Sequence, residues 1–351
     1  MKTITSWDST TTRVPARRKK GLGSWVGRIL LALLALLVGL ATIGASYQAI
    51  ATARDQRIYP PPGRLLDVGG YRMHLYCVGE GRPTVILDAA NMGTVSNWAW
   101  IQPELAKATR VCAYDRAGLG WSDLSPEPQD TQQNAEALHT LLRNADVLGP
   151  YVLVGHSFGG LYTLMFAERF PDEVVGMVLI EGTLPDGLKR LGKPDLMPNA
   201  PDEGMIDFTP VISRLGILRL LGFPPSDPDL PERQFGELQA YLASTKCAEL
   251  IKRQYHLFSM LLAQVRPLYR AGSLGDRPLA VVLGSAGDGG IKEWQELFEQ
   301  QAALSTNHTI RRIDGATHVS LVDRQEHALQ TSAAILQVVE AARTEQPLTT
   351  K

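Results

Sequence analysis

The sequence predicts an α/β fold in which a mostly parallel central sheet carries helices on both faces. Short β-rich runs alternate with helical patterns, as is typical of parallel strands joined by crossover helices. The strand runs are continuously apolar, which indicates that both faces of the sheet are covered. The composition, with 44% hydrophobic and 20% charged residues, agrees with a globular body rather than a disordered or polytopic membrane protein.

The amino-terminal segment differs from the rest of the chain in charge. Residues 1–28 contain seven basic side chains and one acid, whereas the whole chain has a net charge of −1. The remainder is therefore acidic overall, and we expect no nucleic-acid partner. Residues 29–53 carry no charged side chain. At a rise of about 1.5 Å per residue they can cross a hydrocarbon core of about 30 Å.

This pattern predicts one transmembrane helix at residues 29–53, in contact with the lipid bilayer, after a basic cytoplasmic tail at residues 1–28. Because Lys and Arg are retained on the cytoplasmic side, we expect a single-pass membrane protein with a cytoplasmic N-terminus and an extracytoplasmic globular domain. A cleavable signal peptide is the alternative, since Ala51-Thr52-Ala53 resembles a cleavage site. The long leader favours an uncleaved anchor.

A stiff linker is expected at residues 54–63, because Pro60-Pro61-Pro62-Gly63 disfavours a helix. The body then divides into a first core part at residues 64–183, a second core part at residues 273–342 and a flexible tail at residues 343–351. Strands are expected at Tyr71–Val78, Thr84–Asp88, Arg110–Tyr114, Tyr151–Val154, Val175–Ile180, Leu279–Leu283 and Thr309–Ile313. Helices are expected at Thr131–Asn144, Gly160–Phe170, Ile291–Leu304 and Asp323–Ala342.

Residues 184–272 interrupt this alternation. They contain no convincing strand, but many Pro and Gly residues and several amphipathic pieces. An insertion of this length cannot be an ordinary loop, so we expect a helical lid between the sixth and seventh strands. Its aromatic side chains offer apolar surface, which favours a small, uncharged, moderately hydrophobic substrate.

The three cysteines are too few for a disulfide framework, and their spacing matches no zinc site. Cys77 and Cys112 lie in strand-like runs, where we expect small buried side chains rather than reactive thiols. The common metal and nucleotide motifs are absent from the sequence, so we expect neither a metal nor a cofactor.

The motif with the most chemical content is Gly155-His156-Ser157-Phe158-Gly159-Gly160, which follows an apolar strand run and precedes a helical run. Gly-x-Ser-x-Gly at such a junction is typical of a sharp turn that lifts a nucleophilic serine above the sheet. Ser157 is therefore the candidate nucleophile, close to the partial positive charge of a helix N-terminus. The neighbouring His156 should point elsewhere on so tight a turn.

With this motif the chain resembles the α/β-hydrolase superfamily, in particular its lid-bearing, esterase-like members, over residues 64–340. Two further segments carry the resemblance: Asp115-Arg116-Ala117-Gly118-Leu119-Gly120-Trp121-Ser122, and Gly315-Ala316-Thr317-His318 after the last strand. The resemblance implies the α/β-hydrolase fold and a catalytic triad in the order Ser, acid, His. Relatives that open epoxides or displace halide have an aspartate nucleophile, so Ser157 argues against both reactions.

A serine hydroxyl needs a base within about 3 Å to take its proton. The resemblance implies His318 for this role, because it follows the last strand through a short loop. Two carboxylates compete for the third position of the triad: Asp288 after the seventh strand and Glu181 at the end of the sixth. Either can fix the imidazole tautomer. The resemblance slightly favours Asp288, because most relatives carry the acid after the seventh strand.

The oxyanion formed during acyl transfer needs amide donors. Phe158 supplies one, and Asn91 is expected to supply the second, although Ala89-Ala90 stands where the family has His-Gly. These residues predict a membrane-anchored serine hydrolase for carboxylic esters. Cleavage of a peptide, thioester, lactone or carbon–carbon bond, acyl transfer, and a catalytically inactive surface binding protein are the alternatives.

Overall fold

A computed structural model of the protein describes residues 22–187, 203–222, 229–286 and 292–348. Within these residues a central sheet has eight strands in the order β1-β2-β4-β3-β5-β6-β7-β8. β2 is antiparallel to both β1 and β4, and all other neighbours are parallel. The strands are β1 (Arg64–Asp67), β2 (Arg72–Val78), β3 (Thr84–Asp88), β4 (Val111–Asp115), β5 (Tyr151–His156), β6 (Val174–Ile180), β7 (Leu279–Gly284) and β8 (His308–Ile313).

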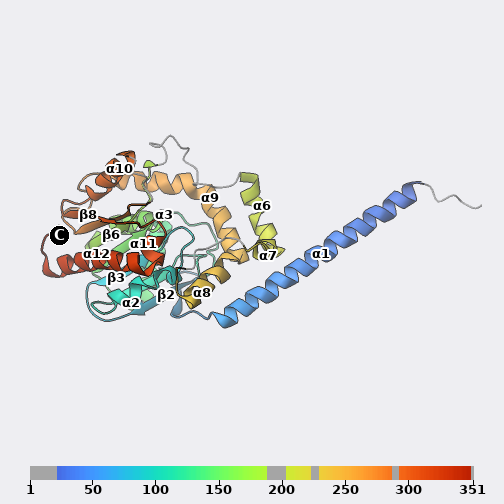
Figure 1. Ribbon diagram of the computed structural model, residues 1–351, viewed down its shortest axis with the longest axis horizontal. Helices are drawn as coiled ribbons and strands as arrows, with labels where there is room; N and C mark the ends of the chain where they lie inside the picture. Colours follow the sequence, from blue (N-terminus) through green and yellow to red (C-terminus); the bar gives the residue numbers. More distant parts are fainter. Residues whose placement is uncertain (1–21, 188–202, 223–228, 287–291, 349–351) are drawn as a thin grey trace, which may run out of the picture.

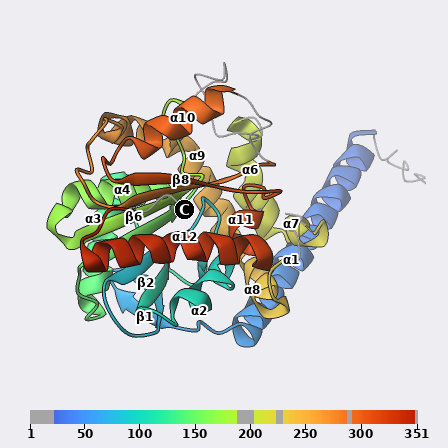
Figure 2. The ribbon, with the colours of Figure 1, turned by 60° about the vertical axis from the view of Figure 1, so that its left-hand side comes forward.

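Helices cover both faces of the sheet, which confirms the predicted architecture (Figures 1 and 2). Side chains of one core come from α3 (Thr131–Asn144), α4 (Gly159–Arg169) and α10 (Lys292–Ala302). Those of the second core come from α2 (Ile101–Leu105), α11 (Ser320–Asp323) and α12 (Gln325–Thr344). Along β5, Leu153 joins the first core while Val152 and Val154 join the second, as expected for a strand whose successive side chains face opposite sides. Short 3₁₀ helices lie at Val95–Trp98, Pro171–Glu173 and Arg266–Leu268.

The predicted strands and long helices lie within a few residues of their positions in the structure, but short elements outside the lid were missed, among them β1, α2 and α11. β1 has four residues and pairs only with β2, and α2 has five residues. Neither is long enough to show a hydrophobic period. The start of α3 had a stronger signal, because Asp130 and Gln133 form a reciprocal capping box.

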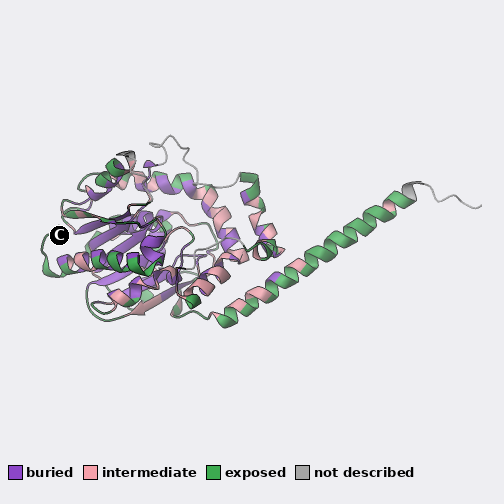
Figure 3. Cartoon of the chain, viewed as in Figure 1, coloured by how far each residue is buried: buried purple, intermediate pink, exposed green. Residues whose placement is uncertain are grey.

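The helix α1 (Leu22–Ile58) is the one helix, among the described residues, that is long and apolar enough to cross a membrane. Its most apolar window is not buried against the rest of the protein, and Figure 3 shows it exposed along most of its length. The predicted linker at residues 54–63 begins too early, since the helix continues to Ile58. The helix therefore ends just before the tetrapeptide Pro60–Gly63 and continues through the charged residues that precede it.

The carboxyl-terminal tail also begins later than predicted. α12 continues to Thr344, and the backbone N–H of Leu348 donates to Asn307 Oδ1 at 2.8 Å. Residues 343–348 are therefore attached to the body. Residues 349–351 lie outside the described part of the chain, as do residues 1–21 of the predicted basic tail.

The segment between β6 and β7 is helical, as predicted. It contains α6 (Glu203–Arg214), α7 (Ile217–Leu220), α8 (Glu232–Leu242) and α9 (Thr245–Val265), while residues 188–202 and 223–228 lie outside the described part. Phe258 of α9 stacks on Phe158 at 5.5 Å between ring centroids. The lid therefore touches the turn that carries Ser157.

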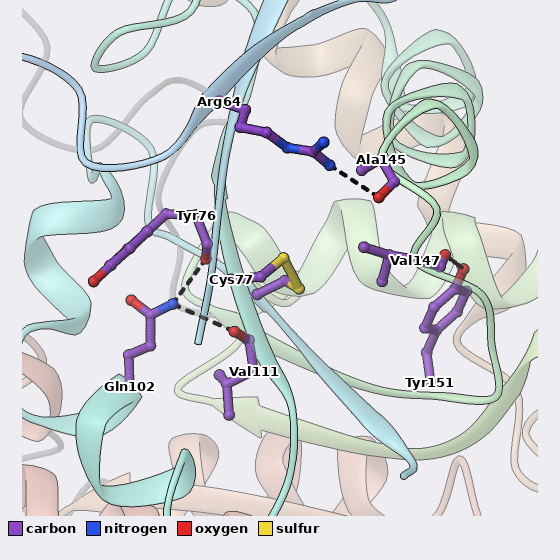
Figure 4. The surroundings of a disulfide bond; sticks show 9 residues. Arg64, Tyr76, Cys77, Gln102, Val111, Ala145, Val147 and Tyr151 are labelled. Carbon is purple, nitrogen blue, oxygen red and sulfur yellow. Dashed lines mark hydrogen bonds between the residues drawn. A yellow bond between two sulfur atoms is a disulfide. The ribbon is translucent and has the colours of Figure 1, made fainter. Parts of the chain in front are cut away.

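Cys77 and Cys112 face each other across β2 and β4 and form a disulfide, which corrects the expectation of two separate buried thiols (Figure 4). The two residues are 35 positions apart. Their proximity depends on the antiparallel register of β2 and β4, which the sequence pattern did not reveal. A cross-link of this span restricts the unfolded chain and contributes about 3–4 kcal/mol to stability in the chain-entropy model.

Candidate active site

Four neighbouring strands end at the same edge of the sheet and position the candidate site. Ser157 follows β5, Glu181 follows β6, and His318 lies in the loop after β8. Gly284 ends β7 between them. Because the strands are parallel, their carboxyl ends gather these residues although they lie far apart in the sequence.

Ser157 occupies the sharp turn between β5 and α4 with a φ of 53°. A left-handed backbone is costly for a residue with a side chain and persists only where the surroundings impose it. Here the neighbouring strand imposes it: the Ser157 N–H donates to Ile180 O at 3.0 Å, and Thr183 N–H donates to Ser157 O at 2.9 Å.

The flanking glycines allow the chain to approach itself closely at this turn. A Cβ on Gly155 would lie 2.6 Å from Gly160 N, and a Cβ on Gly159 would lie 2.2 Å from Asp88 O. Both distances are far below a van der Waals contact. The motif therefore fits α4 against β5 and brings its N-terminus to the loop that follows β3.

His318 and Glu181 form a hydrogen-bonded pair, with 2.7 Å between His318 Nδ1 and Glu181 Oε2. A carboxylate can only accept, so Nδ1 carries the proton and Nε2 is the basic nitrogen of the neutral ring. The other carboxylate oxygen, Oε1, accepts the backbone N–H of Gly284 at 2.8 Å. Glu181 is thus held between β7 and the imidazole.

The structure brings Glu181, one of the two predicted carboxylates, to His318. Its side chain is 13% exposed, and its backbone also has a positive φ of 40°. Asp288 belongs to residues 287–291, which lie outside the described part of the chain. The slight preference for Asp288 relied on family position, whereas Glu181 is placed by the end of a buried strand.

The expectation that His156 points away from the site is wrong. Its Nε2 lies 3.0 Å from the backbone oxygen of His318, and the two imidazole rings are 4.7 Å apart between centroids. Burial, with a further contribution from His318, holds the pKa of His156 well below its usual value. The ring is therefore neutral, and its Nε2–H donates to the His318 carbonyl.

A second unanticipated residue is Arg116, whose guanidinium braces the loop after β3. It is buried and donates to the backbone oxygens of Ala89 at 2.7 Å, Ala90 at 2.8 Å and Asn91 at 3.4 Å. It also pairs with Asp88 and lies over the ring of Tyr162. The sequence signal was its place in the Asp-Arg-x-Gly segment, but its target could not be read from that pattern.

These contacts explain how the loop works without the family's His-Gly. In a trans peptide the C=O and the following N–H point in opposite directions. By collecting the oxygens of Ala89 and Ala90, Arg116 turns the N–H groups of Ala90 and Asn91 to the other side of the loop. Phe158, the cap residue of α4, has an N–H with no acceptor inside its own helix. Phe158 and Asn91 stay the predicted oxyanion donors.

The neighbouring Asp115 fixes the two loops that border this site. Its Oδ1 accepts the N–H of Val95 at 2.9 Å, and its Oδ2 accepts the N–H of Trp121 at 3.1 Å and contacts His74 Nδ1 at 2.9 Å. Burial opposes the charge, but the hydrogen bonds from His74, Val95 and Trp121 lower the pKa of Asp115. A glycine is required at position 120, since a Cβ added there would lie 2.3 Å from Asp115 Oδ2.

No group of three or more His, Cys, Asp or Glu side chains in the described part of the chain is placed to hold a metal ion. The described residues at this edge of the sheet supply a hydroxyl, an imidazole, a carboxylate and backbone amides.

Comparison with known proteins agrees with the fold. A 2-hydroxy-6-oxo-2,4-heptadienoate hydrolase of Pseudomonas putida is 34% identical over 148 residues, which is 39% of this chain and 52% of that protein. An uncharacterized protein of Schizosaccharomyces pombe is 32% identical over 162 residues, which is 38% of this chain and 30% of that protein. The chain thus spans about half, or less, of the length of these curated relatives.

Solved structures and a family model extend the comparison over more of the chain. A membrane phospholipase A matches with a TM-score of 0.55 and 20% identity, covering 90% of this chain and 99% of that one. The family model described as "Alpha/beta hydrolase family" matches residues 90–330. That match covers well over half of the sequence and includes the Ser157 turn, Glu181 and His318. The protein therefore belongs to the alpha/beta hydrolase family.

Proposed function

We propose that the protein is a membrane-anchored serine hydrolase that cleaves carboxylic esters through an acyl-enzyme on Ser157. The observation that carries the proposal is the His318–Glu181 pair, which the residue before Ser157, His156, contacts through the backbone oxygen of His318. This arrangement supplies the base and the orienting acid that a serine needs to become a nucleophile.

In the first half of the reaction, the Ser157 oxygen attacks the ester carbonyl carbon while His318 Nε2 takes the hydroxyl proton. Glu181 stabilises the imidazolium that forms. The amides of Phe158 and Asn91 donate to the oxyanion, and one such donor is typically worth about 3 kcal/mol. Collapse of the intermediate breaks the bond to the alcohol, which leaves with the proton from His318.

In the second half, a water molecule attacks the carbonyl carbon of the acylated Ser157 while His318 takes a proton from the water. The second intermediate breaks the bond to Ser157 Oγ, which recovers its proton from His318. The products are the carboxylic acid and the starting enzyme. His156 holds the backbone of His318 through both halves.

Carbon–carbon bond hydrolysis is the second candidate. It is favoured by the match to the 2-hydroxy-6-oxo-2,4-heptadienoate hydrolase, whose name states that substrate. The two candidates share Ser157 and His318 and differ in the bond that is broken, so direct turnover measurements separate them.

The extracytoplasmic orientation is also part of this proposal. Lys and Arg before α1 favour a cytoplasmic N-terminus, and the disulfide between Cys77 and Cys112 fits an oxidising compartment. Both observations point to the same side of the membrane for the globular domain.

A fluorophosphonate probe at neutral pH should label the full-length protein, and Ser157→Ala and His318→Ala should abolish labelling. The probe reacts only with a serine whose proton can be taken by a neighbouring base. In the same preparation, p-nitrophenyl butyrate should be hydrolysed faster than 2-hydroxy-6-oxo-2,4-heptadienoate. A folded but unlabelled wild type would contradict the serine mechanism, and the reverse order of turnover would favour the second candidate.

Substitution of the two carboxylates should separate their roles. Glu181→Gln should lower kcat by about 10³–10⁴, as expected when the orienting acid of a triad can no longer fix the tautomer. Asp288→Asn, the matched control, should leave kcat within a few fold of wild type. A large loss in Asp288→Asn with little change in Glu181→Gln would assign the acid to Asp288.

His156→Leu should lower kcat by about tenfold with little change in KM, because the loss of one buried hydrogen bond leaves His318 less well positioned. His156→Gln, which can still donate a side-chain N–H, should retain more activity. Equal losses in the two variants would show that the hydrogen bond has no part in positioning His318.

The His156→Gln variant also gives a stability readout. Because the pKa of His156 is lowered in the folded protein, the unfolded chain binds the proton first as the pH falls below about 6.5. The free energy of unfolding should therefore decrease below that pH in the wild type. The decrease should be smaller in His156→Gln, as measured by thermal unfolding in detergent between neutral and mildly acidic pH.

Orientation can be read from thiol counting with a maleimide polymer on protein denatured directly from cells. The chain has three cysteines, so we expect one modified thiol before reduction, at Cys247, and three after it. Three modified thiols before reduction would place the domain in a reducing compartment and contradict the proposed orientation.

A further inference from the structure

The lid carries an exposed apolar surface beside α1, which we call the lid apolar face. It consists of Met205, Phe208 and Val211 on α6 and Ile217, Leu220 and Leu221 at α7. Phe208, Leu220 and Leu221 are 65%, 68% and 75% exposed. Six exposed apolar side chains on two adjoining helices are unusual in water and mark an interaction site.

The arrangement of α6 shows that this surface is not the packed side of the helix. Ile206, Pro210 and Ser213 are buried and face the body. Met205, Phe208 and Val211 recur at intervals of three residues and so form a stripe on the opposite side. The helix is therefore apolar on its outer side as well as on its inner side.

The turn between α6 and α7 abuts the carboxyl-terminal part of α1. A Cβ on Gly44 would lie 2.4 Å from Leu215 O, and a Cβ on Gly216 would lie 2.8 Å from Tyr47 Cδ1. The glycines thus allow α1 and the lid to meet at residues 44–47. Figures 1 and 2 both show α6 and α7 on the side of the body where α1 leaves it.

Polar contacts fix this junction about one and three turns beyond Gly44 along α1. Gln48 is buried, and its Nε2 donates to Ala243 O at 2.9 Å. Arg219 of α7 donates to Gln48 Oε1 at 3.3 Å and forms an ion pair with Asp55 at 2.7 Å. The position of the lid along α1 is therefore defined.

This position can be compared with the expected depth of the bilayer. A hydrocarbon core of about 30 Å takes about 20 helical residues, which from Ile29, the first residue after Arg28, reaches residue 48. Gly44 and Leu215 then lie about 6 Å inside that boundary, at a rise of about 1.5 Å per residue. Interfacial helices bury their apolar face about 5–10 Å into the boundary between headgroups and acyl chains.

We propose that the lid apolar face rests in the outer interface of the same bilayer that α1 crosses, so that the protein contacts the membrane at two places. This inference relies on the proposed anchor but not on the proposed chemistry. The occupant of the surface is phospholipid. A second copy of the chain is the competing occupant, and the experiment below separates the two.

The test uses the full-length protein in vesicles of phosphatidylcholine and phosphatidylglycerol, with an environment-sensitive NBD dye on one introduced cysteine. Leu221→Cys reports on the lid apolar face, and Leu36→Cys reports on the middle of α1. Leu148→Cys is the matched control, since Leu148 is 59% exposed but precedes β5, at the edge of the sheet opposite to the lid. The wild type, with its disulfide and the buried Cys247, gives the background.

We expect spin-labelled lipids with a nitroxide near the headgroup to quench the Leu221→Cys dye several times more strongly than the Leu148→Cys dye. Dilution of the protein in lipid should leave this quenching unchanged. Nitroxides deep in the acyl chain should quench the Leu36→Cys dye.

Each other outcome overturns the inference in a distinguishable way. Quenching at Leu36→Cys, with Leu221→Cys equal to Leu148→Cys, would retain the anchor and reject the lid contact. Quenching at neither Leu36→Cys nor Leu221→Cys would reject the anchor and the lid contact together. Quenching of the Leu221→Cys dye that changes when the protein is diluted in lipid would assign the surface to a second copy. Fluorophosphonate labelling of the same samples reports on Ser157 separately.

Discussion

The backbone at the carboxyl edge of the sheet is the constraint on which the candidate site depends. Ser157 and Glu181 both have left-handed backbone angles, and they follow adjacent parallel strands. Their N–H groups donate to Ile180 O and Val282 O, so each turn is held by the next strand in the sheet. The conformational cost at these residues is offset by the cooperative stability of the buried sheet.

The loops around this edge depend on two buried charges from one segment of the chain. The Asp115 carboxylate accepts the backbone N–H groups of Val95 and Trp121. Arg116 donates to consecutive backbone oxygens of the loop after β3. Burial raises the pKa of Asp88, whereas Arg116 and Tyr114 lower it. The buried charges of Asp88 and Arg116 therefore depend on each other. Where the family has a glycine after β3, this chain has Ala90. The Arg116 side chain holds the loop in place there through hydrogen bonds to its backbone oxygens.

The sequence predicted what depends on local pattern and missed what depends on register. Continuous apolar runs placed β3 to β8, and the glycine spacing placed the turn at Ser157. Three contacts depend on which strands lie side by side: the Cys77–Cys112 bond, the contact of His156 with His318 and the target of Arg116. The hydrophobic period of a single segment carries no such information. Glu181 was a candidate because it ends the sixth strand, where some relatives hold their acid, but its contact with His318 depends on a loop 137 residues away.

The junction between α1 and the lid bears on whether the amino-terminal helix is retained. A cleavable signal would be removed near Ala51-Thr52-Ala53, and with it Gln48, which donates to Ala243 O and accepts from Arg219. Removal would also expose the backbone of Leu215, which now packs against Gly44. These contacts support the proposal that the amino-terminal helix is retained as an uncleaved anchor. Because the same lid reaches the residue after Ser157 through the stacking of Phe258 on Phe158, α1 and the candidate site are connected through the lid by packed side chains.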